Sequence, residues 1–369
     1  MLTRYLDDCR EAVQQEILRI LPSDRRHTGG LYELMLDYPL RYGKMLRPAL
    51  AIGVCGAFGG GLANVLPTAA ALELYHNAFL IHDDVEDLSS LRRAEATLHQ
   101  LHGAATAINV GDAMLAVTME PLLDNMALIG LGRTLRILRI VARMARESAE
   151  GQMLELRWIA TADWSQRDAD YSRLVHKKTG WYSFLAPVMA GAAVAGLDDR
   201  AVGRIGRLFA PLGVAFQIQD DILNLAADHS GYGHSGYGKD ACGDLWEGKH
   251  TLILIHTLRM ADPEERRLAL AILRKPHPAA VGQFAVAVER DSRSNAEVRA
   301  GAAAKTGTEV AFLRDLILRR GGVDYARRTA ARYARRFQQG IRATINPLPA
   351  SDHRDFLAEL ADFVINRQL

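Results

Sequence analysis

Residues 75–87 read YHNAFLIHDDVED, and they close a long apolar run with four acids in five positions. On a helix, Asp83 and Asp87 lie one turn apart and face the same side. Two carboxylates placed so closely repel each other unless a cation lies between them. Hard divalent ions, above all Mg²⁺, prefer oxygen ligands and often complete their shell with phosphate oxygens. The stretch therefore indicates a metal site and a phosphorylated substrate, although acidic helix ends are common by themselves.

A second stretch, AFQIQDDILNL (215–225), repeats this arrangement about 137 positions later. Asp220 and Asp221 follow an apolar run, and Asn224 comes one helical turn after Asp220. The alternative is that the chain has two unrelated acidic helix ends. Two such pairs facing each other across a helical bundle can hold a cluster of metal ions, and we favour that interpretation.

The rest of the chain predicts an all-α fold. Helix-period apolar patterns dominate, and no series of alternating strands with hairpin turns is present. We expect one large helical bundle over residues 1–369 with a central active-site cavity. The tandem repeat HSGYGHSGYG (229–238) predicts a flexible loop near 228–240. The small, polar residues near 288–309 predict a surface insertion.

Composition excludes several classes of protein. A net charge of +2 gives no overall field for nucleic acid or an anionic membrane, so any charge effect must be local. The arginines of 327–342 are best interpreted as a solvated helix face. The apolar stretches 50–74 and 181–197 are interrupted by proline, and the first also by glycines, so neither predicts a transmembrane segment. Three scattered cysteines, with no secretory signal, fit a cytoplasmic protein.

Basic residues lie near both acidic motifs, in short segments that each resemble an ordinary surface stretch. Arginine offers forked donors to phosphate oxygens, and lysine offers a point charge. A site that binds one diphosphate through metal ions and another directly needs such a set. The segments contain Lys44 and Arg47, Arg92 and Arg93, Lys177 and Lys178 with Thr179, and Lys239 and Lys249.

Several motifs in order resemble one family. GKMLRP, HDDVEDLSSLRRAEATLH, AINVGD, GQMLEL, KKTG, FQIQDDILNL and GKDACGDLWEGKHT cover about residues 43–251. They are similar to the trans-isoprenyl diphosphate synthases of the polyprenyl synthetase family, of the short- or medium-chain type. VDYARRTAARYARRF and LAELADFVINR resemble the family more loosely. The resemblance implies a helical isoprenoid synthase fold and a homodimer, and the balanced charge predicts no nucleic-acid partner.

The resemblance also implies the residues of the site. About three Mg²⁺ ions would bridge Asp83, Asp87 and Asp220 to an allylic diphosphate (dimethylallyl, geranyl or farnesyl), with Asp84 and Asp221 in support. The allylic diphosphate would contact Arg92, Lys178, Thr179, Gln217, Lys239 and Lys249. Isopentenyl diphosphate would bind Lys44, Arg47, His76 and Arg93.

The implied reaction is a prenyl transfer. The allylic C–O bond ionises, the double bond of isopentenyl diphosphate attacks the cation, and a proton is lost to the released pyrophosphate. Some residues depart from the family pattern. Ala94 and Ala96 replace the usual glycine and proline after the arginine pair, Glu155 replaces an aspartate, and Asn224 replaces the last aspartate of the second motif. We expect activity to survive these changes.

Product length should depend on the residues before Asp83. Phe79 lies one turn upstream on the same face and can form a floor for the growing tail; simple core packing is the alternative. Ala78 beside it is small, and Tyr75 is the next candidate stop. In the family, bulky residues at these two positions, four and five residues before the motif, shorten the product. One large and one small residue predict a C15 or C20 product, with geranylgeranyl diphosphate (C20) favoured over farnesyl diphosphate.

Two other functions compete with prenyl transfer. A class I terpene cyclase also ionises an allylic diphosphate, but its second metal motif typically combines asparagine, serine and glutamate. It also does not require Lys44, Arg47 and Arg93. A non-catalytic partner subunit of a prenyl synthase would tend to lose its metal-binding aspartates, which are present here.

Overall fold

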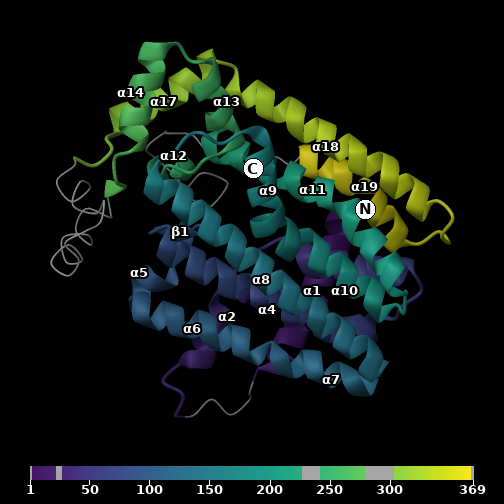
Figure 1. Cartoon of the computed structure of the whole chain (residues 1–369). Helices are drawn as coiled ribbons and strands as arrows, with labels where there is room; N and C mark the ends of the chain where they lie inside the picture. Colours follow the sequence, from purple (N-terminus) through teal and green to yellow (C-terminus); the bar gives the residue numbers. More distant parts are fainter. Residues whose placement is uncertain (1, 22–26, 227–241, 279–302, 367–369) are drawn as a thin grey trace.

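The protein is almost wholly helical (Figure 1). The computed structural model describes residues 2–21, 27–226, 242–278 and 303–366. Its helices are α1 (Leu2–Ile20), α2 (Leu31–Leu40), α3 (Leu46–Ala57), α4 (Leu62–Glu86), α5 (Leu98–His102), α6 (Ala104–Val117), α7 (Met119–Ile129), α8 (Leu131–Thr161), α9 (Asp168–Val175), the π-helix η1 (His176–Leu185), α10 (Ala186–Val194), α11 (Asp199–Ala226), α12 (Gly243–Glu247), α13 (Leu252–Met260), α14 (Pro263–Leu273), α17 (Gly307–Arg319), α18 (Gly322–Ile345) and α19 (Asp352–Asn366). The predicted all-α fold is confirmed.

Helix α4 carries the first acidic motif from the core to the cavity. It is apolar on nearly every side, which is the pattern of a helix surrounded by others. It packs against α1, α3, α6, α7 and α10. The run Ala69–Ala71 is fully buried, and its small side chains let neighbouring helices approach closely. Only the last turns of α4 leave the apolar packing, and Asp83 lies there.

Two apolar clusters make up the core, and two long helices belong to both. The first half of α11 contributes Phe209 to the larger cluster, and its second half contributes Ile218 and Ile222 to the other. Likewise, α18 contributes Phe337 to the first cluster and Ala330 to the second. Residues far apart in the sequence thus join the two clusters through α11 and α18, and the single domain stays a prediction.

Two local features depart from plain helix. A hairpin of two-residue strands, β1 (Leu91–Arg92) and β2 (Glu95–Ala96), follows the first acidic motif, with Arg92 paired to Glu95. The ten-residue π-helix η1 carries Lys178 and Thr179. π-helical turns are rare and occur often at functional sites. Both features lie beside the cavity described below.

The predicted surface insertion near 288–309 needs correction at its end. Helix α17 already begins at Gly307, with the Thr306 side chain capping it. Lys305 is buried, and its Nζ donates to the carbonyl oxygen of Trp246 at 2.7 Å. The repeat at 229–238 and residues 288–302 lie outside the described residues. In the part of the chain that the structure describes, no helix has the length and apolarity to cross a membrane.

Candidate active site

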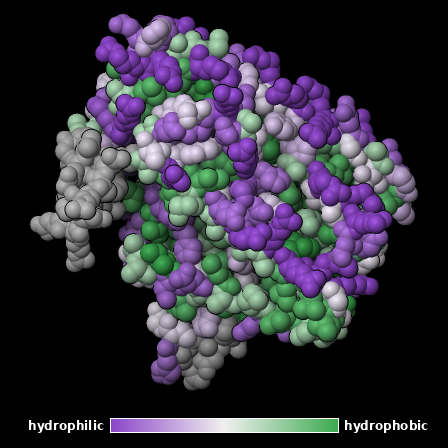
Figure 2. Space-filling model, viewed as in Figure 1, coloured by the Kyte–Doolittle hydropathy of each residue, from purple (hydrophilic) through white to green (hydrophobic). Residues whose placement is uncertain are grey.

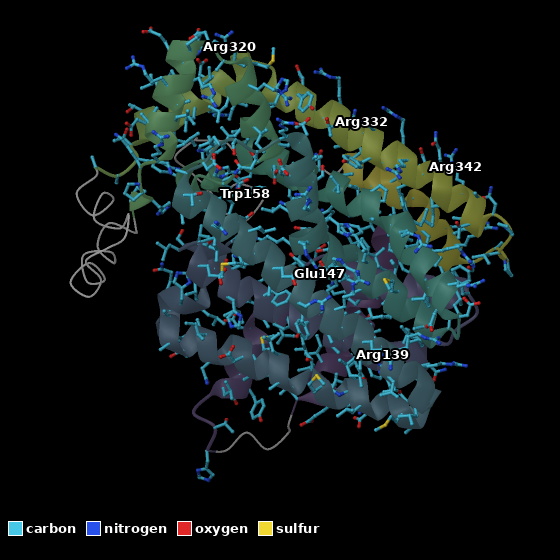
Figure 3. The ribbon with its side chains drawn as sticks, viewed as in Figure 1. Arg139, Glu147, Trp158, Arg320, Arg332 and Arg342 are labelled. Carbon is cyan, nitrogen blue, oxygen red and sulfur yellow. The ribbon has the colours of Figure 1, made fainter. Side chains whose placement is uncertain are left out.

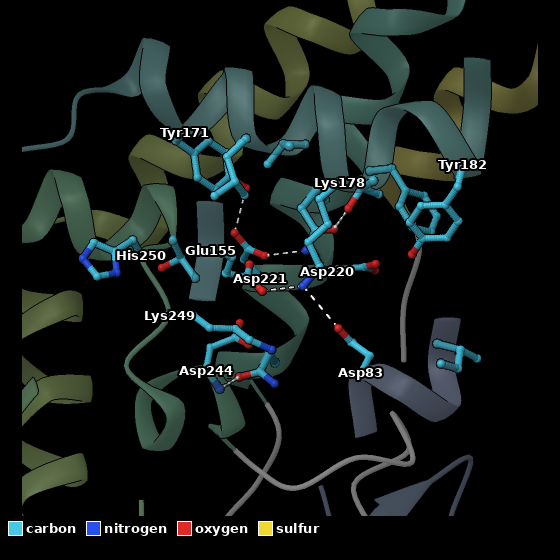
Figure 4. A pocket seen from close by; sticks show the side chains of 18 of the residues that line it. Asp83, Glu155, Tyr171, Lys178, Tyr182, Asp220, Asp221, Asp244, Lys249 and His250 are labelled. Atoms are coloured by element: carbon cyan, nitrogen blue, oxygen red, sulfur yellow. Dashed lines mark hydrogen bonds and ion pairs between the residues drawn. The ribbon is translucent and has the colours of Figure 1, made fainter. Parts of the chain in front are cut away.

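One cavity of about 280 Å³ is lined by residues of both acidic motifs, although Asp87 is not among the described residues that line it. Asp83 reaches it from α4, and Asp220 and Asp221 reach it from α11 (Figure 4). The structure therefore brings the two motifs together, as the sequence predicted. The cavity is also lined by predicted diphosphate-binding residues: Arg47, His76, Arg92, Arg93, Lys178, Thr179, Gln217 and Lys249.

Two half-buried lysines neutralise the first motif. The Nζ of Lys178 lies 3.3 Å from Asp83 and also contacts Glu155 (Figure 4). The Nζ of Lys249 lies 2.6 Å from Asp87. Burial opposes the charge of Lys178, but the acids outweigh it and raise its pKa. Burial also raises the pKa of Asp87, against the opposing charge of Lys249. These acids thus need positive charge, and the lysine side chains supply it here.

The second motif belongs to a hydrogen-bonded chain along the cavity wall. Thr179 Oγ1 donates to Gln217 Oε1 at 2.6 Å, and Gln217 Nε2 donates to Asp221 Oδ1 at 2.9 Å. The hydroxyl of Tyr171 donates to the other Asp221 oxygen at 2.7 Å. Burial raises the pKa of Asp221 well above its usual range, with Asp244 adding to the effect. Asp221 is thus held on both oxygens by its neighbours, and its role in support of the metal ligands stays a prediction.

Asn224 also has a defined contact. Its Oδ1 accepts the backbone N–H of Asp244 at 3.2 Å, and it thereby holds the start of α12 beside α11. An asparagine can fulfil this task without adding a charge. The departure from the family pattern therefore leaves the geometry of the second motif intact.

Asp84 is placed differently from a metal ligand. Its carboxylate is fully buried, accepts the hydroxyl of Tyr38 at 2.6 Å, and accepts Arg92 Nε at 2.9 Å. It is not among the described residues that line the cavity. Its neighbour Asp83 does line it, because adjacent helical residues point in directions about 100° apart. Asp84 thus fixes the guanidinium of Arg92, which does reach the cavity.

Of the residues predicted to bind isopentenyl diphosphate, Arg47, His76 and Arg93 line this cavity and Lys44 does not. Arg47 donates to Ser183 Oγ at 2.7 Å and lies over the ring of Tyr182. Arg93 donates to the backbone carbonyl of Tyr38 at 2.5 Å. Lys44 is exposed instead, with its Nζ 5.5 Å from the centre of the Phe363 ring, and it does not line this cavity. Lys239 lies outside the described residues.

Gly151, in the GQMLEL segment of α8, lets that helix touch η1. A Cβ at this position would lie 2.7 Å from the Cα of Lys178 and 2.9 Å from the carbonyl carbon of Lys177. Both are backbone atoms, so only glycine allows the observed approach. This close packing brings Glu155 of α8 to Lys178, and the longer side chain that replaces the usual aspartate makes that contact.

A second cavity of about 250 Å³ lies on the other side of Asp83, between α4 and α8. Phe79 lines it, as the prediction of a tail floor requires. Tyr75 packs edge-on against Phe79 with ring centres 5.3 Å apart, while Ala78 is buried and is not among the lining residues. Sequence reasoning missed the α8 wall of this cavity: Ser148, Ala149, Gln152, Met153 and Leu156.

Several aromatic residues of the first cavity were also missed. Tyr182 lines both cavities, and its ring contacts those of Phe79 and His76. His250 stacks on Trp164 with ring centres 3.7 Å apart, and burial lowers the pKa of His250 to about 4. No sequence signal distinguishes these side chains from core aromatics, since their role depends on which cavity they face.

The donor set fits a divalent ion held together with a substrate. Within the described ranges, no three His, Cys, Asp or Glu side chains lie close enough to hold one ion by themselves. Mg²⁺ is commonly bound by one or two carboxylates plus phosphate oxygens. Asp83 and Asp220 present such carboxylates from opposite helices, and the substrate would supply the remaining oxygens.

The backbone conformation of Ala94, between β1 and β2, shows why the family usually has glycine at this position. Ala94 has a φ of +65°, a left-handed conformation that glycine adopts without strain. Ala94→Gly should therefore raise the free energy of unfolding by up to about 1 kcal/mol, and with it the thermal unfolding midpoint. Ala96→Gly, in the strand β2, should lower it. Equal effects of the two changes in thermal unfolding would contradict the strain at Ala94.

Comparison with known proteins identifies the family of this chain. The family model described as polyprenyl synthetase matches residues 30–290. A geranylgeranyl diphosphate synthase of Methanosarcina mazei is 30% identical over 335 residues, which cover 88% of this chain and 86% of the relative. The structure of a geranylgeranyl pyrophosphate synthetase from Pyrococcus horikoshii superposes with a TM-score of 0.79 at 26% identity, covering 100% of this chain and 98% of that one.

A third similar protein is a polyprenyl synthase from Caulobacter crescentus, solved with calcium and isoprenyl diphosphate. It has a TM-score of 0.77 and 28% identity, and the match covers 100% of this chain and 97% of that one. The family model extends over more than half of the chain and includes both acidic motifs. The resemblance seen in the sequence is thereby confirmed, and the chain belongs to the polyprenyl synthetase family.

Proposed function

We propose that this protein is a prenyltransferase that condenses isopentenyl diphosphate with an allylic diphosphate. The product would be a C15–C20 prenyl diphosphate, with geranylgeranyl diphosphate favoured. One observation carries the proposal: a cavity lined by carboxylates and cations adjoins, at Asp83, a second cavity of about 250 Å³ that would take the apolar tail. The geranylgeranyl diphosphate synthases among its relatives and structural neighbours support this function and product length.

The cations of the first cavity would bind and orient the diphosphate groups. Lys178 and Lys249, which now contact Asp83 and Asp87, would turn toward the allylic diphosphate when those aspartates bind metal ions. Arg47 and Arg93 line the first cavity but not the second and would hold isopentenyl diphosphate. Bound Mg²⁺ would supply the positive charge that stabilises the leaving diphosphate. The number of ions, about three by resemblance, stays a prediction.

The enclosed site would favour the bond changes of the reaction. The allylic C–O bond breaks, a new C–C bond forms to isopentenyl diphosphate, and the proton lost from it passes to the released diphosphate. The ring of Tyr182 lines both cavities and packs edge-on against Phe79, and these rings would help to keep water from the allylic carbon. Positioning and charge stabilisation are the main catalytic effects such a site offers.

A product assay tests the proposal. Purified protein would be incubated with Mg²⁺, labelled isopentenyl diphosphate and, in turn, dimethylallyl, geranyl or farnesyl diphosphate, with products analysed by mass spectrometry. A dominant C20 or C15 diphosphate is expected. Cyclic hydrocarbons from an allylic diphosphate alone would instead identify a class I terpene cyclase. No turnover with any primer would favour the partner-subunit function.

Product length should respond to both walls of the tail cavity. Ser148 is buried on α8, lines the cavity, and its hydroxyl finds no hydrogen-bond partner among the described residues. Ser148→Leu should fill the cavity and shorten the main product by one or more isoprene units, whereas Phe79→Ala should lengthen it. Ser148→Ala, which leaves the space open, serves as the control. If Ser148→Leu and Phe79→Ala both gave the product spectrum of the wild type, this cavity would not set product length.

We also propose that two copies form a homodimer in the cytoplasm. Large apolar side chains are exposed on α6, α7 and α8, including Ile108, Leu123, Met126 and Leu135. Figure 2 shows hydrophobic side chains gathered at the lower right, over α7 and the start of α8. A second copy would cover such a face. Sedimentation velocity should give a dimer mass, and a monomer would contradict the pairing. The described cysteines are all free, in keeping with a reducing compartment.

A further inference from the structure

The outward side of α18 carries a row of arginines. We define the arginine face as Arg328, Arg332, Arg335, Arg336 and Arg342, all of which are exposed. Figure 3 shows α18 along the upper edge of the molecule, with Arg332 and Arg342 pointing away from the core. At 1.5 Å per residue, the row from 328 to 342 is about 21 Å long. Asp324 is the single acid of this helix.

Among the residues that the structure describes, no acidic side chain forms an ion pair with an arginine of the arginine face. Within the described ranges, the one ion pair formed by an α18 arginine joins Arg327 to Asp324 at 3.8 Å. Arg332 lies one turn from Arg328, Arg335 and Arg336, a spacing at which like charges destabilise a helix. The helix therefore keeps a concentrated positive charge at some cost to its own stability. In a chain of net charge +2, this is a local asymmetry.

The basic surface continues onto the neighbouring helix α11. A Cβ at Gly340 of α18 would lie 2.5 Å from the Leu208 side chain of α11, so the two helices touch at this level. On α11, Arg204 lies one turn before Leu208 and Arg207 directly precedes it, and both arginines are exposed. The positive area thus widens beside the C-terminal half of α18.

We propose that the arginine face docks the protein onto the surface of an anionic lipid bilayer. The opposite side of α18, including Phe337 and Ile341, is buried in the core, so the helix can adsorb to a membrane without inserting into it. The arginine side chains are long and lie in one row on a rigid helix, so several of them can contact a flat layer of anionic headgroups at once. Each basic residue near such a surface strengthens adsorption about fivefold.

The same observations disfavour nucleic acid as the partner. Single-stranded nucleic acid is usually bound by bases stacking on exposed aromatic rings. The two tyrosines of α18 are engaged elsewhere. Tyr325 contacts Asp168 and stacks on His256 with ring centres 4.0 Å apart, and the Tyr333 hydroxyl lies 3.1 Å from Ser172 Oγ.

Membrane docking would also help the proposed reaction, and this argument alone rests on the proposed function. A long prenyl tail leaves an apolar cavity more readily into a bilayer than into water, because its apolar surface stays out of water. Product release often limits turnover. Anionic vesicles should then increase the steady-state rate of the wild-type enzyme.

Vesicle flotation of the full chain tests the docking. At low ionic strength the wild type should float with phosphatidylcholine vesicles containing about one third phosphatidylglycerol, and not with pure phosphatidylcholine. Binding should vanish at about 1 M salt, where the Debye length is about 3 Å. The triple variant Arg328→Gln, Arg332→Gln, Arg336→Gln should bind roughly a hundredfold more weakly. The matching triple change to lysine should retain binding.

A matched control separates this face from total charge. Arg266, Arg267 and Arg274 are exposed on or directly after α14, and their triple change to glutamine alters the net charge equally. This control should bind vesicles like the wild type. Equal loss in both glutamine variants would overturn the proposal, as would undiminished binding by the α18 variant. Binding of single-stranded polyuridylate, but not of vesicles, through the arginine face would assign a nucleic-acid partner instead.

Discussion

Asp83→Asn should lower the rate of prenyl transfer by about 10²–10³-fold, the range found when one preorganised electrostatic contact is lost. Asparagine has nearly the same shape as aspartate but lacks the charge that would hold a divalent ion beside the substrate. In the structure the Asp83 carboxylate faces Lys178 at 3.3 Å and lines the cavity. Steady-state assays over a range of Mg²⁺ concentrations would measure the effect, and more Mg²⁺ should restore part of the rate.

Asp124→Asn provides the control, because Asp124 is exposed on α7, away from both cavities. It removes the same charge and should leave turnover unchanged. Thermal unfolding of both variants would show that the fold is intact. A rate close to wild type for Asp83→Asn at limiting Mg²⁺ would mean that this residue holds no catalytic ion.

Gly151→Ala should damage both stability and activity. The added Cβ would lie 2.7 Å from the Cα of Lys178, and this backbone atom cannot move aside without shifting η1. Overpacking of this kind costs about 1–3 kcal/mol of unfolding free energy. The displaced Lys178 would lose its place beside Asp83, and misplacement by about 1 Å can cost about 10²-fold in rate. Thermal unfolding and steady-state kinetics would measure the two effects.

Gly132→Ala is the matched control on the same helix. No heavy atom lies within 4 Å of a Cβ at Gly132, so alanine there meets open space. Alanine also favours helix over glycine by up to about 1 kcal/mol. The control should therefore unfold at the same temperature as wild type or higher, with full activity. If Gly151→Ala behaved in the same way, the close packing of α8 on η1 would not be needed.

The sequence predicted those features that depend on local chemistry. The spacing of Asp83 and Asp87 predicted a pair on one helical side, and the repeat of the pattern at Asp220 predicted a second such helix end. Helix periodicity predicted the all-α fold. Ordered motifs predicted the family, and with it Lys178, Thr179 and Gln217 at the cavity. Each of these inferences needs only neighbours within a few residues, or an order of motifs along the chain.

The same reasoning missed whatever depends on the rotation of a helix or on residues distant in sequence. It gave Asp84 a supporting role without showing its partners, and the rotation of α4 turns that carboxylate toward Arg92 and Tyr38. It grouped Lys44 with the isopentenyl diphosphate ligands, whereas this lysine lies over Phe363 of α19. The α8 wall of the tail cavity, with Ser148, was invisible because those residues have ordinary helical spacing.

The sequence by itself therefore determined the family, the helical fold and the acidic motifs, since these are properties of short segments and of their order. Only the tertiary structure decided which charges meet. Lys249 pairs with Asp87 across 162 positions, and Lys178 meets Asp83 because Gly151 lets two helices touch. The reason is physical: the interaction of buried charges depends on distances that packing sets, and packing involves the whole chain at once.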